Sequence, residues 1–197
     1  MNKVVGCAAF PMTRHGVFGI LVDADGVLAS GWVADGDIDA LIERVHPSLR
    51  PDLFIVTDRN GELLPSRGRT PEALARLRAA IAAVRAYDDG SDPTAVNTLK
   101  LHTAGGPFHE AVRQAMRTIA PGERLSYAEV AARAGRPRAI RAAGAACAGN
   151  PVPLFVPCHR IVASDGRLAG FAFGLPLKEA LLAEESAWAA AHPRHDT

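Results

Sequence analysis

Residues 121–150, PGERLSYAEVAARAGRPRAIRAAGAACAGN, decide the fold of this chain because they predict two short helices joined by a few residues. Ser126 and Glu129 have the spacing of a capping box at the start of the first helix, and Gly135 suits the position just after its end. Pro137 is expected near the first turn of the second helix. Two short helices with so short a connection form the helix-turn-helix pattern.

The second helix has almost no large side chains on it. A helix stripped of bulk can approach another backbone, or a nucleic-acid groove, very closely, and Arg138 and Arg141 would then project from it. Alternatively, the helix packs tightly against a neighbour and both arginines are solvated. The residue pattern by itself leaves both interpretations open. The small residues are Ala139, Ala142, Ala143, Gly144, Ala145 and Ala146.

The first hundred residues predict a mixed α/β domain. The turn signal DADG between two apolar runs indicates a β-hairpin, and apolar and alanine-rich runs beyond it indicate two helices and a further strand. Thr70 is expected to cap the second of these helices, with Pro71 in its first turn. The predicted elements are a hairpin over 17–33, a helix over 37–45, a strand over 53–58 leading into a turn at 59–61, and a helix over 70–87.

A polar stretch, YDDGSDPTAVN at 87–97, contains glycine and proline and is typical of a linker. After it the chain becomes mostly helical. The sequence therefore predicts an N-terminal α/β domain over 1–98, a helical domain over 99–190 and a short tail over 191–197.

Charge and cysteine content narrow the class of protein. The net charge is only +1, but residues 113–167 hold nine arginines against three acidic residues, which favours an anionic partner. Cys7, Cys147 and Cys158 have no metal-ligand spacing, and an odd count argues against a disulfide framework. No apolar run approaches 18 residues and the first nine residues lack a signal-peptide core, so a cytoplasmic protein without a membrane segment is expected.

The stretch FVPCHRIV at 155–162 places three polar, reactive side chains within an apolar segment. Cys158 needs a base or a positive field to become a nucleophile, and His159 and Arg160 supply both kinds of group. Neighbouring residues on an extended strand point in opposite directions, so a turn or a bridging water is needed to join Cys158 to His159. An accidental Cys-His pair is the competing interpretation.

A helix predicted over PLKEALLAEE at 176–185 carries a carboxylate within its apolar stripe. Glu185 projects between Leu181 and Leu182, where it needs a partner such as a histidine. Glu184 lies at the edge of the same stripe, so helical geometry barely separates the two glutamates.

Five segments resemble, in order and spacing, the O6-alkylguanine-DNA alkyltransferase family. The resemblance covers 108–185 without an obvious gap, whereas the first hundred residues match only in outline. It implies an α+β fold, in which a ribonuclease-H-like N-terminal domain precedes a mostly helical domain with a winged-helix-like helix-turn-helix. The segments are ERLSYAEVAARAG, RAIRAAGAACAGNPVP, VPCHRIV, GRLAGF and LKEALLAEE.

The resemblance implies a suicide DNA-repair enzyme. It would move an alkyl group from O6 of guanine, and less readily from O4 of thymine, irreversibly to Cys158. His159 would take the thiol proton through a water, Glu185 would orient the histidine, and Asn150 would tie the helix-turn-helix to the active-site loop. No cofactor is implied. Some relatives bind zinc in the first domain, but Cys7 is its only cysteine, so no metal is expected.

The family's glutamate lies seven residues after a lysine that matches Lys178, and this selects Glu185 over Glu184. The partner implied is double-stranded DNA, bound through its minor groove by a monomer. In this family the second helix enters that groove. The residues that the resemblance places at the DNA are Tyr127 beside the 3′ phosphate, Arg141 in the gap left by the flipped base, and Ala142 and Gly144 along the groove. The residue pattern adds Arg138, which would project from the same surface.

The pocket for the alkylated base departs from the family pattern. Pro157 and Arg160 belong to the matching box, but Phe171 stands where a tyrosine is usual, so the hydroxyl that would assist the departing guanine O6 is missing. Phe173 replaces a commonly small glycine and would narrow the pocket.

Three other classes remain as alternatives. A lesion-binding protein that does not repair would lack Cys158, and an alkylation-sensing regulator would need base-reading side chains on its second helix. A cysteine hydrolase would need an oxyanion site that the sequence does not indicate.

Overall fold

The computed structural model describes residues 5–34, 36–57 and 71–193, so the turn expected at 59–61 and the cap expected at Thr70 lie outside the described residues. The chain divides into two compact units. The first comprises residues 1–104 with 151–153, and the second comprises residues 105–150 with 154–197. Among the described helices, none is both long enough and apolar enough to cross a bilayer.

The first unit is built on a five-stranded sheet with order β2-β3-β1-β5, in which β4 also pairs with β3. The predicted hairpin is confirmed as the antiparallel pair β3 and β4. β5 pairs in parallel with β1, while the other pairings are antiparallel. The strands are β1 (Val5–Ala9), β2 (Met12–Thr13), β3 (Gly16–Val22), β4 (Val27–Trp32) and β5 (Leu53–Val56).

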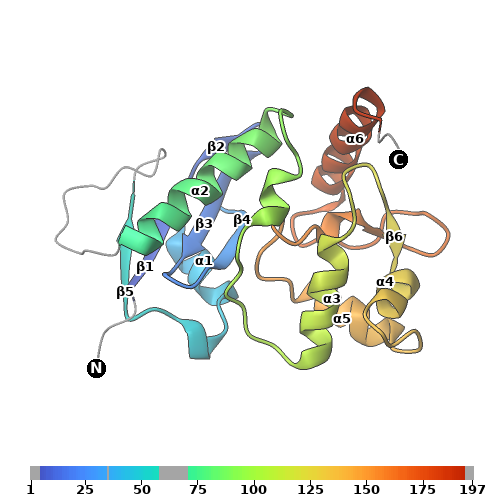
Figure 1. Ribbon diagram of the computed structural model, residues 1–197, viewed down its shortest axis with the longest axis horizontal. Coiled ribbons are helices and arrows are strands. Elements are labelled where there is room, and N and C mark those ends of the chain that lie inside the picture. The colour runs from blue at the N-terminus through green and yellow to red at the C-terminus, as the bar shows by residue number, and fades with distance from the viewer. Residues whose placement is uncertain (1–4, 35, 58–70, 194–197) are drawn as a thin grey trace. The chain divides into compact units, whose positions relative to one another are not determined.

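Both helices predicted in the first unit are present. α1 (Ile38–Arg44) begins after Asp37, whose side chain accepts a hydrogen bond from the N–H of Ala40. α2 (Pro71–Asp88) lies along the sheet in Figure 1 and contacts β1 and β3 through a buried face that includes Leu77. Two short 3-10 turns complete the unit, η1 (Pro47–Leu49) and η2 (Ala95–Thr98).

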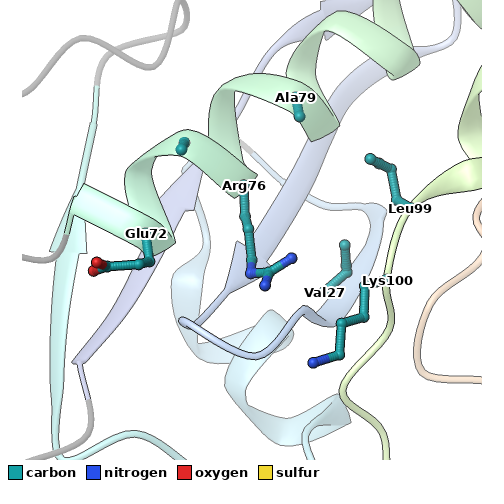
Figure 2. A pocket seen from close by; sticks show the side chains of 7 residues that line it. Val27, Glu72, Arg76, Ala79, Leu99 and Lys100 are labelled. Carbon is teal, nitrogen blue, oxygen red and sulfur yellow. The ribbon is translucent and has the colours of Figure 1, made fainter.

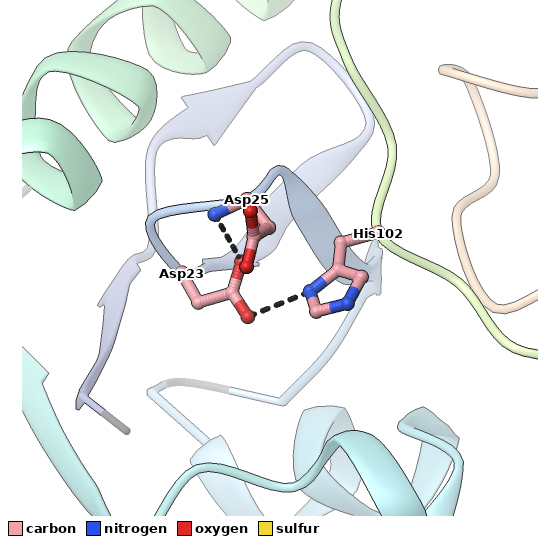
Figure 3. A group of neighbouring side chains, drawn as sticks. All are labelled: Asp23, Asp25 and His102. Atoms are coloured by element: carbon pink, nitrogen blue, oxygen red, sulfur yellow. Dashed lines mark hydrogen bonds and ion pairs between the residues drawn. The ribbon is translucent and has the colours of Figure 1, made fainter. Parts of the chain in front are cut away.

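A side-chain cluster fastens the β3–β4 turn to the segment that follows η2 (Figure 3). One oxygen of Asp23 accepts hydrogen bonds from the backbone of Asp25 at 2.8 Å and Gly26 at 3.0 Å, and the other lies 2.7 Å from Nδ1 of His102. Backbone hydrogen bonds also join Val27 to this segment in both directions. These contacts explain why the chain stays with the first unit through residue 104.

The second unit is mostly helical. α3 ends at Arg117, and Ile119, which the sequence places on the same apolar face, lies beyond the helix but is fully buried. β6 and β7 form a two-stranded parallel sheet. The elements are α3 (Pro107–Arg117), β6 (Leu125–Ser126), α4 (Tyr127–Arg133), α5 (Ile140–Ala148), η3 (Cys158–Arg160), β7 (Ile161–Val162) and α6 (Leu175–Ala191).

Local signals in the helical pair account for its boundaries, with one exception. The capping box is confirmed, because the Ser126 side chain accepts from the N–H of Glu129 while the Glu129 carboxylate accepts from the N–H of Ser126 at 2.7 Å. Gly135 follows α4 with a φ of +78°, a conformation that favours glycine. The prediction for Pro137 is wrong, since α5 begins only at Ile140: Pro137 instead lies in a turn closed by a hydrogen bond from Ala139 to Arg136.

Candidate active site

Cys158 lies at the start of η3, and the backbone there is a turn rather than an extended strand. The N–H of Cys158 donates to the carbonyl of Val156 at 2.8 Å, and that of Arg160 donates to the carbonyl of Pro157 at 3.0 Å. Of the three cysteines, Cys158 alone is partly exposed. Either a turn or a bridging water is needed to join Cys158 to His159, and the structure has the turn.

Asn150 connects the end of α5 to the Cys158 loop. Its side-chain amide donates to the carbonyl of Val156 at 2.8 Å and to Sγ of Cys158 at 3.2 Å. Asn150 is buried, so these bonds fix the amide in place. An N–H directed at sulfur favours the thiolate, because the anion is the better acceptor. The structure therefore brings Asn150 and Cys158 together.

A buried network of three side chains adjoins the cysteine. Nε2 of His159 lies 2.8 Å from one oxygen of Glu185, and the guanidinium of Arg160 binds both oxygens of the same carboxylate at 2.9 Å. The guanidinium also donates to the carbonyl of Ile119. The side chain of Arg160 is fully buried, and its contacts hold Glu185 in position. Glu184, the other candidate, is only partly buried.

The charges of this network follow from burial and pairing. Burial lowers the pKa of His159, and the nearby Glu185 carboxylate only partly offsets this, so the imidazole is neutral near pH 7. Burial would raise the pKa of Glu185, but the attraction of His159 and the hydrogen bonds from His159 and Arg160 outweigh it and hold the pKa well below its usual value. A neutral ring that donates from Nε2 to the carboxylate leaves Nδ1 as a proton acceptor.

Lys178 completes the buried site, although the sequence marks it only as a matching residue. Its ammonium donates to the carbonyls of Ile161 at 2.5 Å and Ala169 at 2.8 Å. Burial lowers the pKa of Lys178, and the attraction of Cys158 works against this. The helical spacing that indicated a buried position for Glu185 also applies to Lys178 and could have predicted its burial. The buried residues of α6 are Lys178, Leu181, Leu182 and Glu185.

One aromatic ring lies beside the histidine, and a second ring lies beside the first. Phe171 lies edge-to-face with His159 at a centroid distance of 6.4 Å, and Phe173 lies edge-to-face with Phe171 at 5.4 Å. Both phenylalanines are partly exposed, whereas Pro157, just before the cysteine, is buried. The three rings therefore form a row that begins at the buried His159 and continues through two partly exposed phenylalanines.

The residues predicted to contact DNA lie on α4 and α5 and on the turn between them. Arg138, Arg141 and Ala142 are exposed. Gly144 faces Tyr127, since a Cβ at this glycine would lie 3.8 Å from the tyrosine ring. Burial raises the pKa of Tyr127, and so do the nearby Cys147 and Cys158.

Arg136 is a further arginine in this region, and the sequence does not single it out. The guanidinium of Arg136, in the turn before α5, lies 5.3 Å from the centroid of the Phe108 ring, within the range of a cation–π contact. Arg136 is exposed and adds a positioned cation to Arg138 and Arg141.

A separate pocket of about 380 Å³ lies in the first unit, between α2 and the segment after η2. Figure 2 shows Arg76 extending from α2 into the region of Val27 and Lys100, with Leu99 also lining the pocket. None of the predicted site residues lines it.

The second unit resembles a known protein family in sequence. Residues 107–187 match the family described as "6-O-methylguanine DNA methyltransferase, DNA binding domain". Methylated-DNA–protein-cysteine methyltransferases from Salmonella typhimurium and Methanosarcina barkeri are each 46% identical, over 90 and 84 residues, which is 46% and 43% of this chain and 53% of either relative. The chain thus spans about half the length of these curated relatives.

Solved structures extend the likeness over most of the chain. OGT of Mycobacterium tuberculosis in complex with DNA superposes with a TM-score of 0.65 at 24% identity, over 92% of this chain and 94% of that one. The O6-methylguanine-DNA methyltransferase of Pyrococcus kodakaraensis gives a TM-score of 0.61 at 23% identity, over 91% and 98%. At these identities the likeness shows the fold, a mixed α/β fold shared with those proteins.

Proposed function

We propose that this chain, whose residues 107–187 belong to the DNA-binding domain family of the 6-O-methylguanine DNA methyltransferases, repairs alkylated DNA by moving the alkyl group to its own Cys158. The substrate is O6-alkylguanine and, less readily, O4-alkylthymine. The observation that carries this proposal is the setting of Cys158: its sulfur accepts an N–H from Asn150 beside a buried His159–Glu185 pair.

The reaction begins with activation of the thiol. Nδ1 of the neutral His159 takes the Cys158 proton through a water, and the anionic Glu185 stabilises the imidazolium that forms. Arg160 keeps Glu185 ionised and fixes its orientation, because its guanidinium holds both carboxylate oxygens. The Asn150 amide and the Lys178 ammonium stabilise the resulting negative charge on sulfur.

The transfer step is a single displacement. The thiolate attacks the alkyl carbon, a C–S bond forms, the C–O6 bond breaks, and the electron pair stays on the guanine, which takes up a proton. The product on the protein is a thioether, which has no facile reverse step. Each molecule therefore reacts once, and no cofactor is needed.

DNA binding places the base in reach of the sulfur. The alkylated atom lies inside a duplex, so the nucleotide must be flipped out, at a cost of a few kcal/mol. The small face of α5, with Ala142 and Gly144, enters the minor groove while Arg141 fills the gap, and Arg138, in the turn before α5, projects toward the DNA from the same surface. Tyr127 crowds the 3′ phosphate. We assign the helical pair a winged-helix-like fold and the first unit a ribonuclease-H-like fold. We also propose that the protein acts as a monomer in the cytoplasm.

The pocket for the flipped base is formed by Pro157, Phe171 and Phe173. Phe171 beside His159, and Phe173 beside Phe171, would exclude water and favour small adducts over bulky ones.

A labelling experiment tests the proposed function. Duplex DNA with O6-[³H-methyl]guanine is incubated in molar excess over the protein, and the label is expected on the protein at no more than one methyl group per molecule. Mass spectrometry of the digested protein should find the added methyl on the peptide that contains Cys158. Repeated turnover, or a methyl group located elsewhere, would refute the assignment.

Phe171→Tyr is expected to speed the transfer about fivefold. A hydroxyl on this ring could donate to the departing O6, and a hydrogen bond contributes roughly 1 kcal/mol, which corresponds to about that factor in rate. Single-turnover kinetics on methylated duplex measure the effect. Phe171→Leu is the matched control, because it changes the same position without adding a donor and should show no gain. An unchanged rate for Phe171→Tyr would mean that the hydroxyl has no role.

A further inference from the structure

Large side chains on the exposed face of α5 are confined to its first turn. Ile140 is the first residue of the helix and is 45% exposed, and Arg141 follows it. The remaining exposed positions of the helix are alanines. Among the described residues of α4 and α5, Ile140 is the sole large hydrophobic side chain that is exposed.

The helix that carries Ile140 is packed against the rest of its unit through its opposite, buried face. Ala143, Ala146 and Cys147 form its buried face, and Sγ of Cys147 lies 3.5 Å from the sulfur of Met116 on α3. Isoleucine is also stiff, because branching at Cβ leaves one strongly preferred χ1 rotamer in a helix. An exposed side chain that is rigid in itself and on a rigid support is suited to push against a partner.

We propose that Ile140 is an apolar wedge that enters the minor groove and separates the base pairs next to the flipped nucleotide. This inference rests on the proposed function and adds to it a positioning residue for the DNA. Successive helical residues point about 100° apart. Ile140 and Arg141 therefore reach different places in the groove, so that one side chain opens the stack while the other occupies the gap.

The chemistry of the minor groove supports this division of roles. Proteins that bend DNA from the minor groove frequently insert Ile, Leu, Met, Phe or Pro between base steps, and they use side chains such as arginine and lysine to read the groove. Here Arg138 and Arg141 lie on either side of Ile140 in sequence, and all three are exposed. A solvated Ile140 is the competing explanation, since single exposed apolar residues are common on protein surfaces.

The direct test measures whether the base next to the flipped nucleotide loses its stacking. Duplex DNA carries O6-methylguanine with 2-aminopurine as its neighbour, and the protein carries Cys158→Ala so that no methyl group is transferred. Binding is expected to raise 2-aminopurine fluorescence, with Ile140→Ala losing at least half of the rise and Ile140→Leu keeping most of it. Met12→Ala is the matched control, because Met12 is 54% exposed on β2 in the other unit. An undiminished rise with Ile140→Ala at saturating protein overturns the wedge.

A kinetic test separates this inference from the proposed function. With Cys158 intact, Ile140→Ala is expected to slow transfer from duplex DNA about tenfold and transfer from a single-stranded oligonucleotide less than twofold, because a single strand has no pair to open. Equal losses on both substrates, or no loss on either, contradict the wedge. Absence of transfer by the wild-type protein would instead refute the proposed function, and the fluorescence test would still decide the role of Ile140.

Discussion

Cys158→Ala is expected to retain no labelled methyl group after incubation with methylated duplex DNA, whereas Cys147→Ala is expected to retain as much as the wild-type protein. The two cysteines differ in environment, although both lie in the second unit. Cys158 is partly exposed and accepts the Asn150 amide. Burial, together with the nearby Cys158, raises the pKa of Cys147 to about 12, which keeps that thiol protonated and unreactive.

This comparison discriminates between repair and mere lesion binding. A protein that only binds alkylguanine would bind the DNA equally well with and without Cys158 and would acquire no label in either form. Circular dichroism and urea unfolding should show that both variants are folded, with changes in unfolding free energy of about 1 kcal/mol or less. Label on Cys158→Ala at the wild-type level would show that another residue accepts the alkyl group.

Glu185→Gln is expected to lower the unfolding free energy by about 3 kcal/mol and to slow methyl transfer roughly a hundredfold. The substitution leaves the fully buried Arg160 guanidinium without its anionic partner, and breaking one side of a buried ion pair typically costs about 3–5 kcal/mol. The amide also cannot stabilise the imidazolium of His159, and general-base catalysis is worth about 10²-fold or more.

Glu184→Gln is the matched control for this prediction. Glu184 is the neighbouring residue on α6 and is only partly buried, so its unfolding free energy should change by no more than about 0.5 kcal/mol. Urea unfolding and single-turnover kinetics measure both variants. Similar losses for the two variants would contradict the assignment of Glu185 to the buried network.

The pH dependence of the unfolding free energy provides a second way to compare Glu185→Gln with Glu184→Gln. The folded-state pKa of Glu185 lies below its ordinary value of 4.5, so its stabilisation is present above that pH and is lost as the pH falls below it. The pKa of His159 is also lowered, from 6.5, so the unfolded chain takes up a proton there first and acid favours unfolding. Glu184→Gln should lose stability steeply near pH 4, and Glu185→Gln less so. Parallel curves would show that Glu185 carries no such stabilisation.

Much of the second unit follows from signals that span only a few residues. The capping box at Ser126 and the glycine at position 135 set the start and end of α4, and each depends on backbone groups three or four positions away. The alternation of apolar and charged residues along α6 placed Glu185 in its buried face. Sequence resemblance then chose between Glu185 and Glu184, and that choice agrees with the burial of each.

Local signals mislead where a turn competes with a helix. Pro137 is a good residue for the first turn of a helix, yet the chain closes a turn at 136–139 before α5 begins. The extended backbone considered for Cys158 is likewise replaced by a 3-10 turn. In both places short-range preferences are nearly balanced, and packing against the rest of the unit decides between them.

The sequence by itself determined which residues are reactive or charged and where α4 begins and ends. Only the tertiary structure decided their partners. Arg160 meets Glu185 across 25 residues of chain and Ile119 across 41, and no local pattern records either contact. The carbonyls that hold Lys178 belong to segments 9 and 17 residues away. A charged residue in an apolar stretch indicates that a partner is needed, because burying an unpaired charge is costly. Which residue becomes that partner depends on which distant segments the fold brings together.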